Sequence, residues 1–336
     1  MNDVLLIQRI HIYYLMPGNR SVEEGIEIVD DYNSPRLKRI ILQEDEMNLI
    51  TEAVQRQDVD HLKKLLNFSG VLATKSKQFA QKDINKLSQE MKLDLLRYFW
   101  ENIEPSNAQM VGMLCKSLKM WLHLKDEFCE MTEELACHDE WYVREVAAEI
   151  MGEAILADEE YCQHLERYAR SDNVKLRRHA ALCARAASRA STENFTKILS
   201  FVEPLMGDEN SQITEIMATT TVASRFLKTY PKETINWLEK VADTESLSQR
   251  RCVILSFSHN IDKALVPHAL HFIEKYLSDE RKEVRNASEH VLAQLCKVGE
   301  MKVNLWLQNH MDSKAALEHW ANLSATGALK SAEFLY

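Results

Sequence analysis

The sequence predicts an all-α protein, built as a right-handed solenoid of paired helices with an N-terminal cap. Three observations lead to this fold class. A segment at residues 139–155 recurs in recognisable form at residues 172–188 and 279–295. Each copy has an acidic residue, an aliphatic–Arg pair, and then small and apolar residues at helical spacing. The chain also has few helix breakers, with 8 Gly and 6 Pro in 336 residues, which favours long helices and short turns.

The spacing of the repeated arginines gives the size of the repeating unit. Arg144 and Arg177 are 33 residues apart, and Arg251 and Arg285 are 34 apart. A degenerate copy surrounds Thr214. A period of this size holds two helices and two turns, which is the unit of a HEAT-like α-solenoid.

Three regions follow from this pattern. Residues 1–80 do not fit the repeat, and we interpret them as an N-terminal cap or adaptor, because a solenoid must cover the apolar face of its first repeat. Residues 81–325 form the predicted solenoid, and residues 326–336 form a C-terminal tail. The polar segment 75–83 is the expected linker between the cap and the solenoid.

Helices are expected in steady alternation, whereas the apolar residues 4–15 fit either a strand or a buried helix. Asp58 should begin one helix as its N-cap, because its side chain can accept a hydrogen bond from an unpaired backbone amide. Small residues cluster on the second helix of each repeat, where they allow neighbouring helices to approach closely. The expected helices outside the repeated segments cover residues 36–55, 59–66, 87–103, 108–124, 127–137 and 310–323.

Composition limits the functional classes. The net charge of −10 argues against a protein that coats nucleic acid indiscriminately, since such binding depends on phosphate neutralisation by Lys and Arg. Seven cysteines without paired spacing, and a start that lacks a secretory signal, predict a cytoplasmic protein. No apolar run is long enough to span a membrane, so no membrane partner is expected.

The charge is unevenly distributed along the chain. Residues 126–160 contain thirteen Asp or Glu and one Arg, whereas residues 167–189 contain seven Lys or Arg and one Asp. One interpretation is that neighbouring repeats attract each other. The other is a local anion-binding patch on a protein that otherwise repels polyanions.

The repeated arginines also allow two interpretations. In the structural one, an Arg early in the second helix bonds a neighbouring carbonyl or carboxylate, and Asp172 caps its helix. In the functional one, the second helices line a concave face and the planar guanidinium groups bind phosphate. Trp141 either stacks on a base at the lip of this groove or packs between repeats. The candidate phosphate-binding residues are Arg144, Arg177, Arg178, Arg185, Arg251 and Arg285.

No metal site and no cofactor are predicted. His268, His271 and Glu274 occupy one helical face, but no second ligand-bearing helix is evident. The sequence has no glycine-rich nucleotide-binding motif and no nucleophile elbow, so neither a nucleotide cofactor nor acyl transfer is expected.

Several of these segments resemble the HEAT-like DNA alkylation repair superfamily, the AlkC and AlkD type alkylpurine glycosylases. Residues 284–297 with 303–307 resemble a late repeat of that family, residues 176–180 its arginine-bearing repeat, and residues 141–145 the repeat before it. The resemblance covers roughly residues 85–310. It implies a C-shaped solenoid that holds duplex DNA in its concave face, and metal-free release of alkylated purines assisted by an acidic residue.

The chain departs from that family in several places, and the AlkC-type Glu and Trp expected after the paired arginines are absent, with Leu182 and Ser188 in their neighbourhood. Arg144 stands where motif matching places the AlkD-type catalytic Asp, and His290 stands where a late groove-facing Trp is expected. The nearest carboxylates are Glu145 and Glu149, which are therefore the candidate catalytic residues.

Two functions remain open at this stage. The first is a DNA alkylation repair-like protein that binds duplex DNA, either as a monofunctional alkylpurine DNA glycosylase or as a non-catalytic relative. The alternative is a HEAT-repeat scaffold without catalytic activity that binds a protein partner along its concave face.

Overall fold

The computed structural model divides into two compact units, Met1–Arg36 and Leu37–Tyr336. The residues that the structure describes belong to the second unit and are 38–298 without Ser69, Ser106 and Asn260, together with Val303, Leu305, Trp306 and Asn309. The expectations for residues 4–15, for the helix at 310–323 and for the tail at 326–336 lie outside the described residues. The predicted boundaries at residues 80 and 325 stay predictions.

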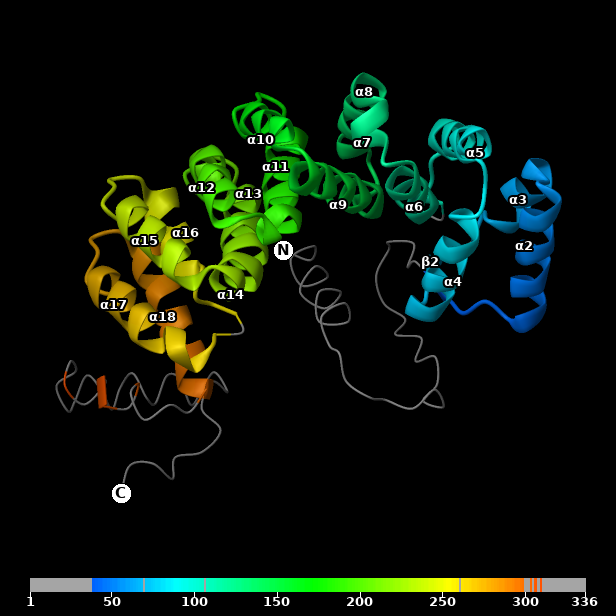
Figure 1. Cartoon of the computed structure of the whole chain (residues 1–336). Helices are drawn as coiled ribbons and strands as arrows, with labels where there is room; N and C mark the ends of the chain where they lie inside the picture. The colour runs from blue at the N-terminus through cyan, green and yellow to red at the C-terminus, as the bar shows by residue number, and fades with distance from the viewer. Residues whose placement is uncertain are drawn as a thin grey trace. The chain divides into compact units, whose positions relative to one another are not determined.

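The described chain begins with a small parallel β pair and three helices (Figure 1). Strand β1 (Lys38–Ile40) pairs in parallel with β2 (Gly70–Leu72). These two three-residue strands interrupt the otherwise helical secondary structure of the described residues. The helices of this region are α2 (Glu44–Arg56), α3 (Val59–Leu65) and α4 (Thr74–Ile84).

The prediction of a linker at residues 75–83 was wrong. This segment lies within α4, where Ala80 and Ile84 are fully buried and bring the helix into the core. The prediction for the start of α3 is confirmed, because the Asp58 carboxylate accepts a hydrogen bond from the backbone N–H of His61 at 3.0 Å. The polar composition of residues 75–83 therefore did not show whether this segment was a loop or a helix with one buried face.

From residue 89 onward the described chain is a succession of helices. Short 3₁₀ turns at η1 (Glu159–Tyr161), η2 (Ala187–Arg189) and η4 (Lys263–Leu265) join some of them. The segment η3 (Ile216–Phe226) is wound as a π-helix. The α-helices are α5 (Gln89–Glu101), α6 (Ala108–Leu118), α7 (Met120–His123), α8 (Lys125–Ala136), α9 (Trp141–Ala157), α10 (Cys162–Ala169), α11 (Val174–Ala186), α12 (Thr192–Met206), α13 (Ser211–Glu215), α14 (Leu227–Thr229), α15 (Pro231–Ala242), α16 (Leu247–Leu255), α17 (Val266–Tyr276) and α18 (Lys282–Val298).

These helices form two layers, which confirms the predicted helix-pair repeat. The pairs are α5/α6, α8/α9, α10/α11, α12/η3, α15/α16 and α17/α18. The second helices contact each other in chain order, from α6 through α9, α11, η3 and α16 to α18 (Figure 1). We call these the second-helix layer, and α5, α8, α10, α12, α15 and α17 the first-helix layer.

The expected helix over residues 108–124 is interrupted. It divides into α6 and α7 at Lys119, whose φ of 47° places it in the left-handed region. The α6 carbonyls of Cys115 and Lys116 accept hydrogen bonds from the Lys119 N–H, so the turn satisfies the end of the first helix. The sequence has no glycine at this position to signal the break.

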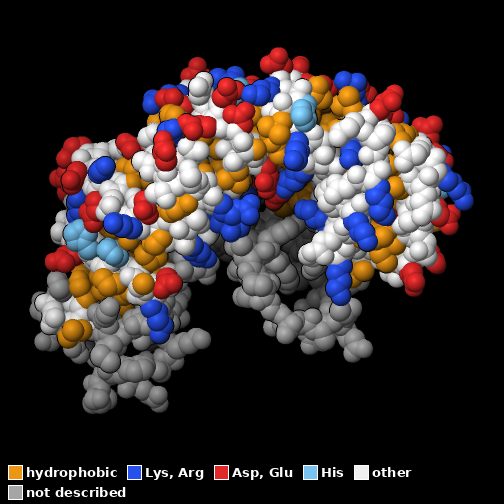
Figure 2. Space-filling view, in the orientation of Figure 1, with side chains coloured by type: hydrophobic (Ala, Val, Ile, Leu, Met, Phe, Trp, Pro, Cys, Tyr) orange, Lys and Arg blue, Asp and Glu red, His pale blue; other side chains and the backbone are white. Residues whose placement is uncertain are grey.

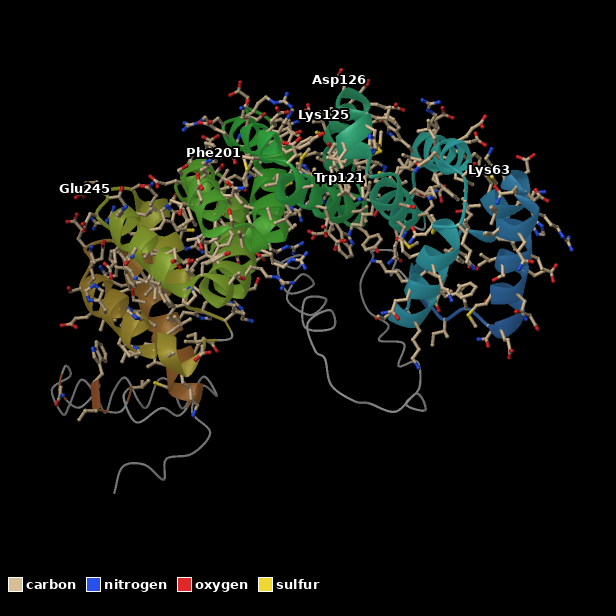
Figure 3. All side chains as sticks on the ribbon, in the orientation of Figure 1. Lys63, Trp121, Lys125, Asp126, Phe201 and Glu245 are labelled. Atoms are coloured by element: carbon tan, nitrogen blue, oxygen red, sulfur yellow. The ribbon has the colours of Figure 1, made fainter. Side chains whose placement is uncertain are left out.

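Repeat-spaced polar pairs link neighbouring helices of the first-helix layer. Arg167 of α10 pairs with Glu133 of α8, and Lys197 of α12 pairs with Glu159 of η1. Lys125, at the start of α8, pairs with Asp158, the residue that follows α9, at 3.0 Å (Figure 3). Of these pairs, Arg167 with Glu133 joins the basic stretch to the acidic one, and Lys175 of α11 does the same with Asp139 at 2.9 Å, as the first of the two interpretations predicts.

Close packing in the second-helix layer depends on small side chains. Gly152 of α9 faces Ala186 of α11, and a Cβ at Gly152 would overlap the Cβ of Ala186 and lie 3.2 Å from its backbone. Ala147, Ala148 and Ala154 of α9 are fully buried as well. The clustering of small residues on second helices thus allows α9 and α11 to approach each other.

The α9–α11 contact provides a direct test of this packing. Gly152→Ala should lower the free energy of unfolding by about 1–3 kcal/mol through overpacking, although alanine favours a helix by about 1 kcal/mol over glycine. Gly112→Ala is the matched control, because its Cβ would lie 3.1 Å from the movable Cγ1 of Val146. Denaturant unfolding of both variants measures the difference, and equal stabilities would contradict the proposed close contact.

Candidate functional site

Three of the candidate arginines hold the loop that precedes their own helix. The Nη1 of Arg144 donates to the carbonyl of His138 at 2.7 Å. Arg177 and Arg285 do the same with residues five and six positions earlier, at distances between 2.6 and 3.1 Å. This geometry matches the structural interpretation, because the guanidinium donors satisfy carbonyls at the end of a preceding helix or turn.

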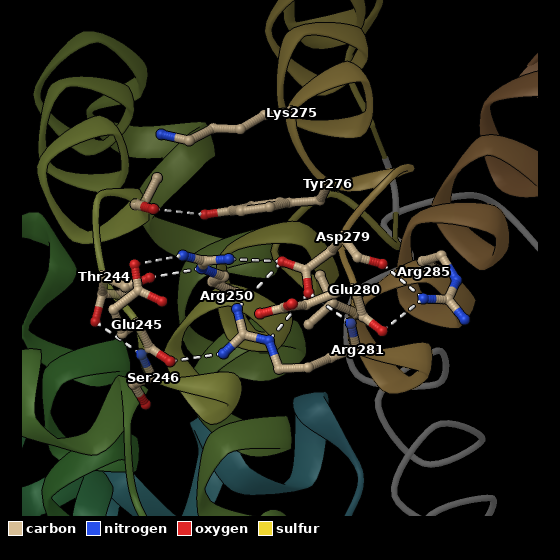
Figure 4. Close-up of polar contacts among 12 residues, drawn as sticks. Thr244, Glu245, Ser246, Arg250, Lys275, Tyr276, Asp279, Glu280, Arg281 and Arg285 are labelled. Atoms are coloured by element: carbon tan, nitrogen blue, oxygen red, sulfur yellow. Dashed lines mark hydrogen bonds and ion pairs between the residues drawn. The ribbon is translucent and has the colours of Figure 1, made fainter.

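The fourth position in this series is Arg250, not the predicted Arg251. Its Nε donates to the carbonyl of Thr244 at 2.5 Å, and its Nη1 contacts Asp279 at 2.7 Å (Figure 4). Counting from Arg250 gives 35 residues to Arg285. Arg251 makes no hydrogen bond or ion pair with any residue that the structure describes, and it stays a candidate for ligand contact.

Two of these arginines also connect consecutive repeats through a buried carboxylate. Arg177 binds Asp208 at 2.7 Å, and Arg250 binds Asp279 at 2.7 Å. The side chains of Asp208 and Asp279 are only 4% and 2% exposed. We call this arrangement, an Arg bonded to its own preceding loop and to the acid of the next repeat, the arginine clasp.

Charged neighbours lower the pKa of Asp279 well below its usual range. The main cause is hydrogen bonding from the Arg281 side chain, and Arg250 adds to it. Asp279 also accepts from the backbone N–H of Arg281 at 2.9 Å, so it organises the turn before α18 (Figure 4). The expected cap Asp172 has a different role, because Asn173 is the N-cap of α11 and the Asp172 carbonyl receives Arg177.

Glu145, one candidate catalytic carboxylate, is bound by two arginines of the next second helix. Its Oε1 lies 3.3 Å from Arg178 Nη2, and its Oε2 lies 2.7 Å from Arg185 Nη2. All three side chains are at most 20% exposed. Burial lowers the pKa of the Arg178 guanidinium, and Glu145 opposes that effect. With both oxygens paired, Glu145 is better suited to holding α9 against α11 than to contacting a substrate.

Glu149, the other candidate, is exposed and lies one turn further along α9. It accepts no hydrogen bond from the residues that the structure describes. Its surroundings are cationic, because Lys77 of α4 and Arg225 of η3 both interact with it electrostatically. Glu153 follows after one more turn and lies 3.8 Å from Lys116 of α6 and 3.6 Å from Arg189 of η2. The three carboxylates therefore form a row along one face of α9.

Four of these cations were missed by sequence reasoning. Lys77, Lys116, Arg189 and Arg225 come from different repeats and from positions outside the repeated aliphatic–Arg motif. Tertiary packing brings them together, since α6, η2 and α11 contact α9, while α4 contacts α6 and η3 contacts α11. We call the set the α9 site; it consists of the carboxylates Glu145, Glu149 and Glu153 and the cations Lys77, Lys116, Arg178, Arg185, Arg189 and Arg225.

The α9 site is locally positive on a protein of net charge −10. Its six cations outnumber its three carboxylates. Partial burial lowers the pKa of the Arg225 guanidinium, and the nearby Arg185 and Arg189 lower it further. Figure 2 shows Lys and Arg side chains gathered at the lower edge of the second helices, while the upper edge, over the first helices, carries Asp and Glu side chains interspersed with Lys and Arg.

Trp141 begins α9 and is half-buried against the core. Its ring meets Tyr142 edge to face, with centroids 5.5 Å apart. This position matches the packing interpretation rather than a base-stacking one.

His179 of α11 is buried beside this site and points away from solvent. Its Nε2 lies 3.2 Å from Cys183 Sγ, and burial lowers the pKa of the imidazole to about 3. It is therefore neutral at physiological pH and does not act as an acid in that range. Within the described residues, no three His, Cys, Asp or Glu side chains converge where they could hold a metal ion. None of the described helices is long and apolar enough to cross a bilayer.

The fold and the α9 site define a helical-repeat protein with a cationic face that surrounds a carboxylate. A model of the DNA alkylation repair enzyme family matches residues 48–217 and 215–321. The chain therefore belongs to the DNA alkylation repair enzyme family, as the resemblance predicted. A comparison with curated proteins found no match.

Solved structures show only a distant likeness. An engineered protein is 16% identical, with 84% of this chain and 85% of that chain covered and a TM-score of 0.29. A designed armadillo repeat protein in complex with the peptide (KR)4 is 12% identical, with 74% and 98% covered and a TM-score of 0.27. Scores this low do not establish a common fold, so the repeat architecture rests on the helix packing described above.

The arginine clasp should contribute to stability in a pH-dependent way. Asp279→Asn is expected to lower the free energy of unfolding by about 2 kcal/mol at pH 7, because it leaves Arg250 and Arg281 without their buried partner. The folded pKa of Asp279 lies below its unfolded value of about 3.9, so the stabilisation is complete above that pH and disappears as pH falls through the lower folded value.

Denaturant unfolding at pH 7 and near pH 3 measures this effect. The difference in the free energy of unfolding between wild type and Asp279→Asn should be smaller near pH 3 than at pH 7. Glu280→Gln is the matched control, since the neighbouring Glu280 is exposed and should change stability by no more than about 0.5 kcal/mol. A pH-independent gap would mean that the charge of Asp279 is not what stabilises the repeat junction.

Proposed function

We propose that this protein binds alkylated duplex DNA along its second-helix layer and releases the damaged purine, with Glu149 as the carboxylate at the reacting sugar. Family membership supports the substrate class. The observation that carries the proposal is the position of Glu149, an exposed carboxylate that interacts electrostatically with Lys77 of α4 and Arg225 of η3 and lies one turn from Glu153, which pairs with Lys116 and Arg189.

The cations of the α9 site supply the means of binding DNA. Affinity for a duplex comes largely from neutralising phosphates with Lys and Arg. Arg189 has a side chain that is 70% exposed and is paired only loosely with Glu153, so it can turn to a phosphate. Arg225 is exposed and has no hydrogen-bonding partner among the described residues. The acidic first-helix layer would repel the same polyanion, which restricts binding to one side of the helices.

The arginines that bind the carbonyls before their own helices have a different role in this proposal. Arg144, Arg177 and Arg285 spend their donors on backbone carbonyls and, for Arg177, on Asp208. Removing one of them from those partners would leave buried polar groups unpaired, at a cost of about 1–3 kcal/mol. DNA phosphates therefore bind the cations of the α9 site more readily, and these three arginines hold the helices that carry them.

The proposed role of Glu149 follows from the charge that develops as a base departs. As the C1′–N bond breaks and the N-alkylated purine leaves with the electron pair, the sugar becomes oxocarbenium-like until water adds to C1′, and a carboxylate near C1′ stabilises the positive charge electrostatically. The surrounding cations would oppose this effect in the free protein. Once phosphates neutralise them, the carboxylate faces the developing cation with less competition. DNA binding would thus prepare the site as well as hold the substrate.

The first test is release of free alkylpurine from methylated duplex DNA by the purified protein. Wild type should release base, and Glu149→Gln should slow single-turnover release by about 10²-fold. Glu153→Gln is the matched control, because it removes a carboxylate one turn away on the same face of α9 and should change the rate less than about threefold.

Absence of release by a folded wild-type protein would reject the glycosylase step. If duplex binding remained, the protein would be a non-catalytic relative within the family. If binding were absent too, the scaffold alternative would take its place, with a protein partner rather than DNA. An equal loss of rate in both variants would show that Glu149 has no special role.

The second test concerns phosphate binding. Arg225→Ala should weaken duplex binding to a similar degree for all sequences and reduce the slope of log Kd against log salt by about 1. Arg170→Ala is the control, since this arginine is also exposed but pairs with Glu166 at 3.3 Å at the end of α10. Titrations at several salt concentrations distinguish the two. An unchanged slope for Arg225→Ala would place the DNA elsewhere.

A further inference from the structure

A buried hydroxyl group joins the segment that carries Arg225 to the preceding repeat. Thr221 of η3 is fully buried, and its Oγ1 donates to the backbone carbonyl of Ala181 in α11 at 2.9 Å. Ala181 is fully buried as well, and η3 packs directly against α11. The bond therefore crosses from one repeat to the next inside the second-helix layer.

Two other hydroxyl groups of η3 bond only within their own helical segment. Thr219 Oγ1 donates to the carbonyl of Glu215 at 2.8 Å, and Ser224 Oγ donates to the carbonyl of Thr220. In both bonds the acceptor lies four residues earlier, which is the usual local bond of a helical Ser or Thr. Thr221 differs from them because its acceptor belongs to a neighbouring helix.

The position of Arg225 follows from this contact. Arg225 comes four residues after Thr221, and Arg185 comes four residues after Ala181. Four residues make about one turn of α11 and slightly less than one turn of the π-wound η3. Arg185 and Arg225 interact electrostatically, as expected if the two segments continue side by side from the bonded pair. The hydroxyl bond thus lies about one turn from the place where arginines of two repeats meet.

Arg225 needs a fixed backbone to stay in this place. Its neighbours include Arg185 and Arg189, and like charges repel each other. The π winding of η3 adds a second requirement. If one turn of η3 rewound as an α-helix, the residues after it would rotate about the helix axis, and Arg225 would be among them. A bond from η3 to α11 opposes both movements.

We propose that Thr221 is a positioning residue for DNA binding, whose hydroxyl fixes η3 against α11 so that Arg225 reaches the same stretch of phosphates as Arg189. The inference rests on the proposed DNA binding and adds to it a residue that does not touch DNA. Thr221 acts through Arg225, because the exposed guanidinium group, and not the buried hydroxyl, is available to a phosphate.

The first part of the test compares threonine variants in salt titrations with labelled duplex DNA. Thr221→Val replaces the hydroxyl with a methyl group and should weaken binding by about fivefold, roughly 1 kcal/mol. The slope of log Kd against log salt should also fall, because the displaced Arg225 no longer neutralises a phosphate. Thr221→Ser keeps a hydroxyl and should stay within about twofold of wild type.

Thr219→Val is the matched control. It makes the same chemical change two residues away, where the hydroxyl bonds only its own segment, and should also stay within about twofold of wild type. Thr221→Ala is the second variant without a hydroxyl, and it places no additional methyl group beside the Ala181 carbonyl. It should lose affinity as Thr221→Val does. Denaturant unfolding identifies the variants that are folded under the titration conditions.

The second part of the test repeats Thr221→Val in an Arg225→Ala background. If Thr221 acts through Arg225, the change should then weaken binding by less than about twofold, because the side chain that it positions is gone. A loss as large as that in the wild-type background would show that Thr221 supports the whole helix layer, and would overturn the positioning role.

The outcomes separate the two proposals. Equal affinities of wild type and Thr221→Val, an equal loss in Thr219→Val, or a loss in Thr221→Ser as large as in Thr221→Val overturns the role of Thr221 while DNA binding stands. Failure of wild type to bind the duplex overturns the proposed function, and the role of Thr221 fails with it.

Discussion

The arginine clasp is the interaction on which the rest of the structure depends. One side chain, such as Arg177, satisfies carbonyls of the loop before its own helix and also binds the buried acid of the next repeat, Asp208. A buried carboxylate costs free energy unless it is paired and hydrogen-bonded, and the clasp does both. Arg250 and Asp279 repeat the same arrangement. Each clasp therefore ties the start of one second helix to the turn that precedes the next one. That order fixes which side chains can meet across the second-helix layer.

The division of charge between the two layers follows from this order. First helices are joined by partly exposed pairs such as Arg167 of α10 with Glu133 of α8, each of which contributes little stability. In the second-helix layer, small residues such as Gly152 bring α9 close to α11. The long side chains around this contact then converge, and Arg225 and Lys77 reach the surroundings of Glu149. A protein of negative net charge thereby acquires a local positive face.

The sequence predicted the parts of this structure that depend on periodicity and local capping. The helix-pair repeat, the Asp58 cap and the attraction between acidic and basic repeats all follow from spacing that is visible in one chain. It did not distinguish Arg250 from Arg251, because adjacent arginines fit the same period and only the direction of the side chain separates them. The linker at residues 75–83 was wrong because burial of Ala80 outweighs a polar composition. In the α9 site, the sequence predicted Arg178 and Arg185 together with two of the carboxylates. It missed the other four cations, because they follow no motif and meet through tertiary packing alone.

The central claim is that DNA lies against the second-helix layer around Glu149. Photo-crosslinking of a halogenated duplex to the protein, followed by mass spectrometry of the crosslinked peptides, tests it most directly. The account predicts crosslinks in peptides from α4, α6, α9 and the η3–α14 segment, and loss of these crosslinks as salt is raised. Crosslinks confined to α8, α10 or α12 of the first-helix layer would contradict it, because the DNA would then lie on the opposite side of the helices.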